Sequence, residues 1–211
     1  WAMLLAAPKA EPLNEVSSRG KDVFGEVGCT GCHVPSLVGP RGAIFAYTDL
    51  LLHDMGDSLA DGLEMGVATT REFRTSPLWG IGAVGPYLHD GRADTLDQAI
   101  RLHDGEGKKA RDAYVAAAGA DRDALIEFLL SLGGREVRTP GLIPPNTPRA
   151  AVGEPGGTIR ELTAEEAVKW QLGRDFFDRD MFLSGGLGPI FNGDNCRACH
   201  FDPVPGGAGP L

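Results

Sequence analysis

The sequence CTGCH stands at residues 29–33, and the sequence CRACH stands at residues 196–200. Both follow the pattern CxxCH, in which two residues separate the cysteines and a histidine follows directly. This pattern is typical of c-type haem attachment, because the two thiols reach the two vinyl groups of one porphyrin and the histidine turns onto the iron. We therefore predict two covalently bound haem c groups. The predicted haem-binding residues are Cys29, Cys32, His33, Cys196, Cys199 and His200, with His33 and His200 as iron ligands.

Two other kinds of site use paired cysteines. The four cysteines of the chain all lie in these motifs and could in principle form a zinc site with four thiolate ligands. That reading leaves the histidine after each pair unexplained. A redox dithiol of the thioredoxin kind would need a βαβ context, which the sequence does not suggest. Haem attachment is the interpretation that accounts for all five positions of both motifs.

Composition narrows the class of protein. The chain has 211 residues with 30 Gly and 15 Pro, which favours a loop-rich fold over long regular elements. Its formal net charge of −9 argues against nucleic acid as a partner and favours a partner with a basic docking face. No run approaches 18 apolar residues, so we predict no transmembrane segment.

Four helices are predicted in the first part of the chain, at residues 13–27, 95–103, 108–118 and 121–132. The first carries an apolar stripe. In the second, Thr95 and Gln98 have the spacing of a capping box, and His103 falls on its apolar face. Residues 34–94 read as loops with short helical turns. The stripe of the first helix consists of Val16, Gly20, Val23, Phe24 and Val27.

A Gly- and Pro-rich stretch follows, with six Gly and five Pro in residues 133–157. We predict that it is a linker. A further capping box, Thr163 with Glu166, opens a helix whose apolar residues recur every four positions. The prediction is a mainly α, loop-rich fold: a cytochrome c-type haem domain at residues 1–134, a linker at 135–160, and an incomplete cytochrome c-like haem segment at 161–211. The apolar residues of the last helix are Ala164, Val168, Leu172 and Phe176.

The sixth ligand of the first haem is predicted to be His103, because a histidine on the buried face of a helix is well placed to coordinate iron. Its competitors are Met55, Met65, His53 and His89. For the second haem no distal ligand can be named with the same support, and Met181 is only a weak candidate. The ligand could also come from another chain.

Several stretches around the first motif resemble the C-terminal, electron-transfer haem domain of bacterial di-haem oxidoreductases, which are related to di-haem cytochrome c peroxidase. The resemblance implies that the distal ligand of the electron-transfer haem falls at His103 and makes this haem bis-histidine. The matching stretches are GCTGCHVP at 28–35, YTDLLLHDMG at 47–56, EFRTSPLWG at 72–80, PYLHDG at 86–91 and TLDQAIRLH at 95–103.

Residues 172–177 and 186–200 instead resemble the N-terminal, peroxidatic haem domain of the same family. The order of the two domains is therefore inverted relative to the family. A junction between tandem copies, a permuted gene, or segments out of family order would each explain it. The family's distal-pocket acid lies downstream of the peroxidatic motif, so no catalytic acid is carried over to this chain.

These observations predict a di-haem c-type cytochrome for electron transfer, with peroxidase-like oxidoreductase activity. The alternative is a non-enzymatic multihaem conduit or a subunit of a larger electron-transfer complex. The expected partner is a redox protein or a neighbouring haem subunit, and an oligomer could complete the second haem pocket. Covalent haem attachment implies a periplasmic location or the cell surface.

Overall fold

The computed structural model describes residues 4–40, 42–135, 147–181 and 195–200. The chain divides into two compact units, one formed by residues 10–135 and the other by the described parts of 1–9 and 136–211. Residues 4–9, which the sequence grouped with the first haem domain, thus fall with the second unit. Residues 136–146 of the predicted linker and residues 182–194 and 201–211 of the C-terminal segment lie outside the described residues.

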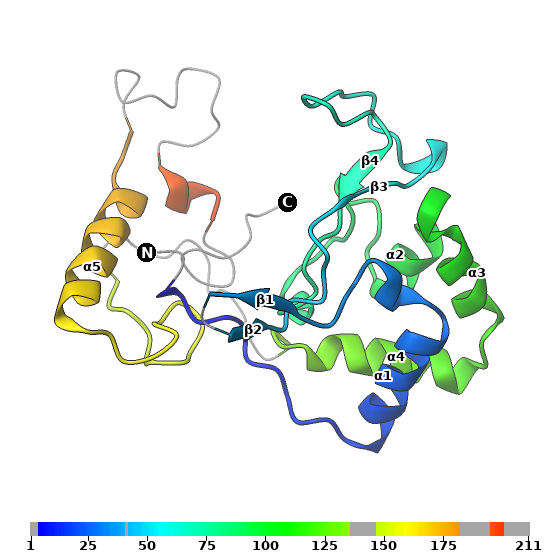
Figure 1. The fold of residues 1–211 in the computed structure, drawn as a ribbon, viewed down its shortest axis with the longest axis horizontal. Coiled ribbons are helices and arrows are strands. Elements are labelled where there is room, and N and C mark those ends of the chain that lie inside the picture. Colours follow the sequence, from blue (N-terminus) through cyan, green and yellow to red (C-terminus); the bar gives the residue numbers. More distant parts are fainter. Residues whose placement is uncertain (1–3, 41, 136–146, 182–194, 201–211) are drawn as a thin grey trace. The chain divides into compact units, whose positions relative to one another are not determined.

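The first unit contains the four helices that the sequence predicts (Figure 1). They are α1 (Glu15–Glu26), α2 (Leu96–Leu102), α3 (Lys108–Ala116) and α4 (Gly119–Ser131). Helix α4 ends just before Gly133 and Gly134, which both adopt positive φ angles. The described part of the chain is therefore mainly helical, as predicted.

Local hydrogen bonds fix where two of these helices begin. The side chain of Asn14 accepts from the Ser17 amide at 2.9 Å, and Ser17 Oγ accepts from the Asn14 amide at 2.9 Å, which completes a capping box that the sequence analysis missed. At α2 the predicted box forms only in part. Thr95 accepts from the Gln98 amide, but the Gln98 side chain accepts from Asp94 instead of Thr95.

The core of the first unit lies where α1 crosses α4. A Cβ placed on Gly20 would lie 1.9 Å from the carbonyl oxygen of Ala124, so only glycine permits this close approach. Phe24 packs against Phe128 with ring centroids 5.4 Å apart. Val16, predicted to belong to the apolar stripe, is 51% exposed, whereas Ser17 next to it is buried, so the covered face of α1 begins at Ser17.

We predict that Gly20→Ala lowers the free energy of unfolding by about 1–3 kcal/mol, because the new methyl group overpacks the crossing. Gly25→Ala on the same helix is the matched control, since a Cβ there meets nothing within 4 Å. Its higher helix propensity should make it neutral or stabilising by up to about 1 kcal/mol. Urea unfolding of both variants followed by circular dichroism checks this, and equal effects would contradict the close contact.

Two short hairpins occupy the region predicted to be loops and helical turns. Strands β1 (Leu37–Gly39) and β2 (Gly42–Ile44) pair antiparallel, as do β3 (Leu52–Asp54) and β4 (Glu72–Arg74). Strands of three residues are too short to show the alternation of apolar and polar residues by which strands are recognised. Single 3-10 turns at residues 57–59 and 81–83 account for the predicted helical turns.

The second unit is built around α5 (Ala164–Asp178), which begins with the predicted capping box between Thr163 and Glu166. The segment before it folds back on the N-terminal residues. Ile159 donates its amide to the Leu4 carbonyl at 2.9 Å, and Ala6 donates to the Gly157 carbonyl at 3.0 Å. Part of the stretch predicted to be a linker is therefore hydrogen-bonded structure.

The apolar residues that recur every four positions along α5 lie on its exposed face. Val168, Leu172 and Phe176 are each more than half exposed, whereas Trp170, Arg174 and Asp178 are the buried residues of this helix. An i, i+4 apolar pattern identifies a helix face but not which face is covered. Among the helices of the described residues, none is long and apolar enough to cross a membrane.

Candidate haem sites

The two CxxCH motifs adopt the same backbone turn, although they lie in different units. Each begins with a 3-10 turn, at Cys29–Gly31 and at Cys196–Ala198. In both motifs the amide of the histidine donates to the carbonyl of the first cysteine at 2.9 Å, and the amide of the second cysteine donates to the same carbonyl at 3.3 Å. The turn therefore depends on contacts inside the motif and places both thiols on one short loop.

All four cysteines are free thiols in the structure. Burial raises the pKa of the Cys29 thiol to about 12 and raises that of Cys32, with Asp49 and Glu106 adding to the second shift. Both sulfurs of the first motif are thus neutral at ordinary pH. The described residues show no disulfide that would compete with attachment to a porphyrin.

His33 is held in one orientation by the backbone. Its Nδ1 lies 3.0 Å from the carbonyl oxygen of Tyr47, and because a carbonyl only accepts, Nδ1 carries the proton. Burial lowers the pKa of His33 to about 4, so the ring is neutral at pH 7. A neutral ring with its proton on Nδ1 leaves the Nε2 lone pair free, which is the state an iron ligand needs.

His103 shows the same arrangement at the end of α2. It is the C-cap residue rather than part of the helix, and its Nδ1 donates to the Ala99 carbonyl at 2.8 Å. Burial lowers its pKa as well, and Arg111 donates to the His103 carbonyl at 2.9 Å. A positive charge on His103 would further lower the pKa of His33.

The two residues predicted to hold the first haem iron therefore share the same state. Both imidazoles are neutral, and both have Nδ1 occupied by a backbone carbonyl. Hydrogen bonds of this kind fix the tautomer and ring orientation of metal-bound histidines and raise their basicity. Each residue could offer its Nε2 to an iron.

The competing ligands of the first haem are placed less well. His53 uses both ring nitrogens, at 2.9 Å to Asp49 and 2.8 Å to Glu106, so it has no lone pair to offer. His89 stacks on Phe73 with ring centroids 4.1 Å apart. Met65 is 78% exposed.

Met55 lies beside the predicted ligand His103. A Cβ placed on Gly107 would lie 3.3 Å from Met55 Cε and 3.3 Å from His103 Cβ, so the two side chains border the same small space. Met55 therefore belongs to the surroundings of His103.

The second motif is fastened to α5 by charged and polar side chains. Arg174 Nε pairs with Asp178 Oδ2 at 2.7 Å, and the other oxygen of Asp178 lies 3.5 Å from Arg197 Nε within the motif. Asn195 donates to Asp180 at 2.8 Å and accepts from the Ala198 amide at 2.6 Å. These contacts fix the turn that carries His200.

The structure assigns no distal ligand to His200. The weak candidate Met181 has its sulfur 3.7 Å from the guanidinium of Arg179. Residues 182–194 and 201–211, which flank the second motif, lie outside the described residues.

The sequence did not predict three groups of the first site, which are the Tyr47 carbonyl and the side chains of Asp49 and Glu106. Every residue has a backbone carbonyl, so the sequence cannot show which one binds the histidine. The i, i+4 spacing of Asp49 and His53 was a usable signal. Glu106 lies 53 residues from His53 along the chain, and nothing short of the fold connects them.

Residues 1–132 match the family described as "Di-haem oxidoreductase, putative peroxidase". The chain belongs to this family. The second CxxCH motif lies beyond the matched residues.

Among solved structures, the chain is similar to a MauG-like protein associated with microbial copper homeostasis, with 22% sequence identity and a TM-score of 0.39. The similarity covers 58% of this chain and 48% of that one, so this chain spans about half the length of the similar structure. The comparison with curated proteins found no match.

The two carboxylates bound to His53 make the stability of the folded protein depend on pH. Hydrogen bonds to Glu106 and then to Asp49 raise the pKa of His53 in the folded protein. The stabilisation is therefore fully present below the unfolded pKa of about 6.5 and is lost as the pH rises through the folded value. We expect the urea midpoint of the wild type to fall between pH 6 and pH 9 by more than that of His53→Gln. If the urea midpoints of the two proteins change with pH in the same way, His53 does not contribute to the pH dependence of stability.

Proposed function

We propose that this chain is a di-haem c-type redox protein of the peroxidase-like kind, and that its first haem transfers electrons. The observation that carries this proposal is the matched state of His33 and His103, which are neutral and oriented by carbonyls through Nδ1. A haem bound there would supply reversible one-electron exchange between ferric and ferrous iron. If both imidazoles held the iron, no position would remain for a substrate.

The surrounding residues support a rigid, dry site. Phe24, Tyr47 and Phe128 form an aromatic cluster next to His33, with ring centroids 5.4 to 6.0 Å apart. Phe24 also lies 6.4 Å from the His33 ring. A packed aromatic wall excludes water from the proximal side and limits movement of the ligand when the charge on the iron changes.

The second motif is the proposed site of peroxide chemistry. Reduction of peroxide requires an open iron position and an acid that assists cleavage of the O–O bond. The alternative is a conduit in which both irons are six-coordinate and electrons pass on to another haem. The spin state of the second iron separates these functions: a high-spin fraction that reacts with hydrogen peroxide supports the peroxidase, and two low-spin irons support the conduit.

The distal ligand of the first haem can be tested by substitution. In protein matured with haem, His103→Ala should convert one of the two irons from low-spin to high-spin, because it removes an axial imidazole. His89→Ala is the matched control and should leave the spectrum unchanged. Electron paramagnetic resonance and resonance Raman spectra give the readout. An unchanged low-spin signal in His103→Ala would refute the bis-histidine assignment.

Covalent attachment makes a separate prediction. Acid–acetone extraction should leave two haems on the wild type, and mass spectrometry should show the chain plus two haem masses. The double variant Cys29→Ala/Cys32→Ala should retain only the second haem, and Cys196→Ala/Cys199→Ala should retain only the first. A colourless wild-type chain that contains zinc would contradict haem attachment and support the zinc site with four thiolate ligands.

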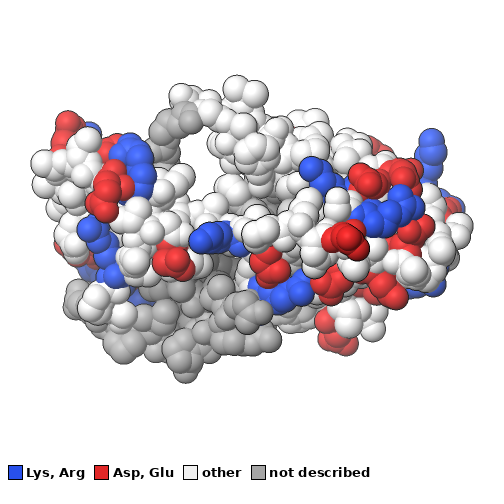
Figure 2. Space-filling view, turned by 90° about the horizontal axis from the view of Figure 1, so that it is seen from below, with Lys and Arg blue, Asp and Glu red and all other residues white. Residues whose placement is uncertain are grey.

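Location and partner belong to the same proposal. Because covalent haem attachment takes place outside the cytoplasmic membrane, we place the protein in the periplasm or at the cell surface. The net charge of −9 favours a redox partner with a basic face. The face in Figure 2 shows acidic side chains interspersed with basic ones, so docking there would depend on local pairing as well as net charge. A second haem subunit or an oligomer could complete the second pocket.

A further inference from the structure

We propose that Asp49, His53 and Glu106 form a clamp that holds the distal ligand loop, residues 103–107, against strand β3 and so keeps His103 on the iron. This inference rests on the proposed function, because it concerns the same first haem. His53 and its two carboxylate partners are then positioning residues that act through His103.

The centre of the clamp is a histidine ring bound on both sides. His53 Nδ1 lies 2.8 Å from Glu106 Oε2, and His53 Nε2 lies 2.9 Å from Asp49 Oδ2. A carboxylate only accepts, so a ring that donates from both nitrogens is the protonated imidazolium. The side chains of His53 and Asp49 are only 15% and 13% exposed, which strengthens these charge-assisted bonds relative to bonds at an open surface.

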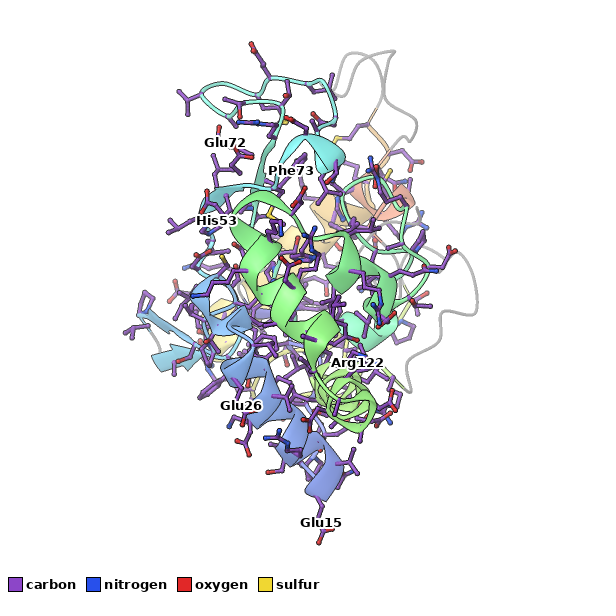
Figure 3. All side chains as sticks on the ribbon, turned by 90° about the vertical axis from the view of Figure 1, so that its right-hand side faces the viewer. Glu15, Glu26, His53, Glu72, Phe73 and Arg122 are labelled. Atoms are coloured by element: carbon purple, nitrogen blue, oxygen red, sulfur yellow. The ribbon has the colours of Figure 1, made fainter. Side chains whose placement is uncertain are left out.

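Glu106 also bonds the distal loop to β3 at a second point. Its other oxygen, Oε1, accepts from the Asp54 amide at 3.0 Å, so a single carboxylate binds both the side chain and the backbone of β3. His53 is paired with Phe73 on β4, and Figure 3 shows both residues on these neighbouring strands. The loop is therefore fastened to a hairpin rather than to a free strand.

The backbones of the loop and the strand end also touch. Gly105 has φ +53°, and a Cβ there would lie 2.2 Å from the Asp54 carbonyl oxygen and 2.6 Å from the Gly56 nitrogen. Ser58 donates to Asp104 at 3.3 Å. Without the clamp, this close contact would have few other polar bonds to hold it together.

The other end of the clamp reaches the attachment side of the first haem. Ligand atoms of Asp49 and His53 lie within 4.8 Å of each other and of Cys32 Sγ. Two residues before Asp49, the Tyr47 carbonyl orients His33. One segment, residues 47–54, thus touches the proximal histidine, the attachment cysteine and the distal loop. A change at His53 is expected to loosen the distal side, because Tyr47 is held independently of it.

The test uses the haem-loaded protein and cyanide as a competing ligand. For His53→Ala we expect cyanide to bind the ferric first haem at least tenfold faster than in the wild type, and the reduction potential of that haem to shift. Glu106→Gln should accelerate binding by a smaller factor, because the amide oxygen still accepts one bond. Because the Glu106 side chain is exposed, Glu106→Gln should disturb folding little, and it can be measured if His53→Ala loads haem poorly.

Two controls separate a positioning role from general loss of stability. Glu165→Gln removes an exposed carboxylate of α5 that pairs with Lys169, and it should bind cyanide at the wild-type rate. Asn14→Ala removes the cap at the end of α1 farther from the motif, lowers stability through the loss of that cap, and should also leave the rate unchanged. If the destabilised Asn14→Ala protein matches His53→Ala in rate, the clamp is only a structural feature.

The remaining outcomes distinguish this inference from the proposed function. If His103→Ala binds cyanide rapidly while His53→Ala and Glu106→Gln stay within twofold of the wild type, the clamp is refuted and the bis-histidine haem stands. If His103→Ala is itself indistinguishable from the wild type, the proposed function fails first.

Discussion

The close approach of α1 and α4 at Gly20 is the contact on which the first unit depends. It lets the two helices cross with backbone against backbone, and it directs Phe24 into the aromatic cluster beside His33. The chain leaves α1 at Glu26 and enters the first CxxCH turn only three residues later. The position of the attachment turn is therefore set by the helix crossing, and α4 contributes to the site without any haem-binding residue.

The two halves of the chain hold the same turn by opposite means. The first turn follows a helix whose buried face is apolar. The second is tied to α5 through a buried aspartate, Asp178, and two arginines, Arg174 and Arg197. Buried ion pairs recover only part of their desolvation cost, so they add less net stability than apolar packing while fixing geometry closely. The exposed apolar face of α5 shows the same contrast, since the described residues do not cover it.

Sequence patterns predicted what depends on neighbours along the chain. The five helices of the described residues, the capping box at Thr163 and both attachment motifs are local, and each was found. The outcome was different where distant segments meet. The hairpins have strands of three residues, the pattern of α5 did not show which face is covered, and the Glu106 partner of His53 could not be predicted. His103 was predicted to be an iron ligand because it falls on the apolar face of a helix, but its orienting bond to Ala99 required the structure.

The identical hydrogen bonds of the two CxxCH turns bear on the order of events in the cell. All of them span four residues or fewer, so closing the turn costs little chain entropy and needs no tertiary structure. Under the proposed function, either motif could therefore accept its porphyrin before the rest of the chain has folded. The porphyrin would then be present while the glycine-rich loops fold and would offer them an apolar surface to pack on. If so, the irregular loops of the chain would not have to fold without the cofactor.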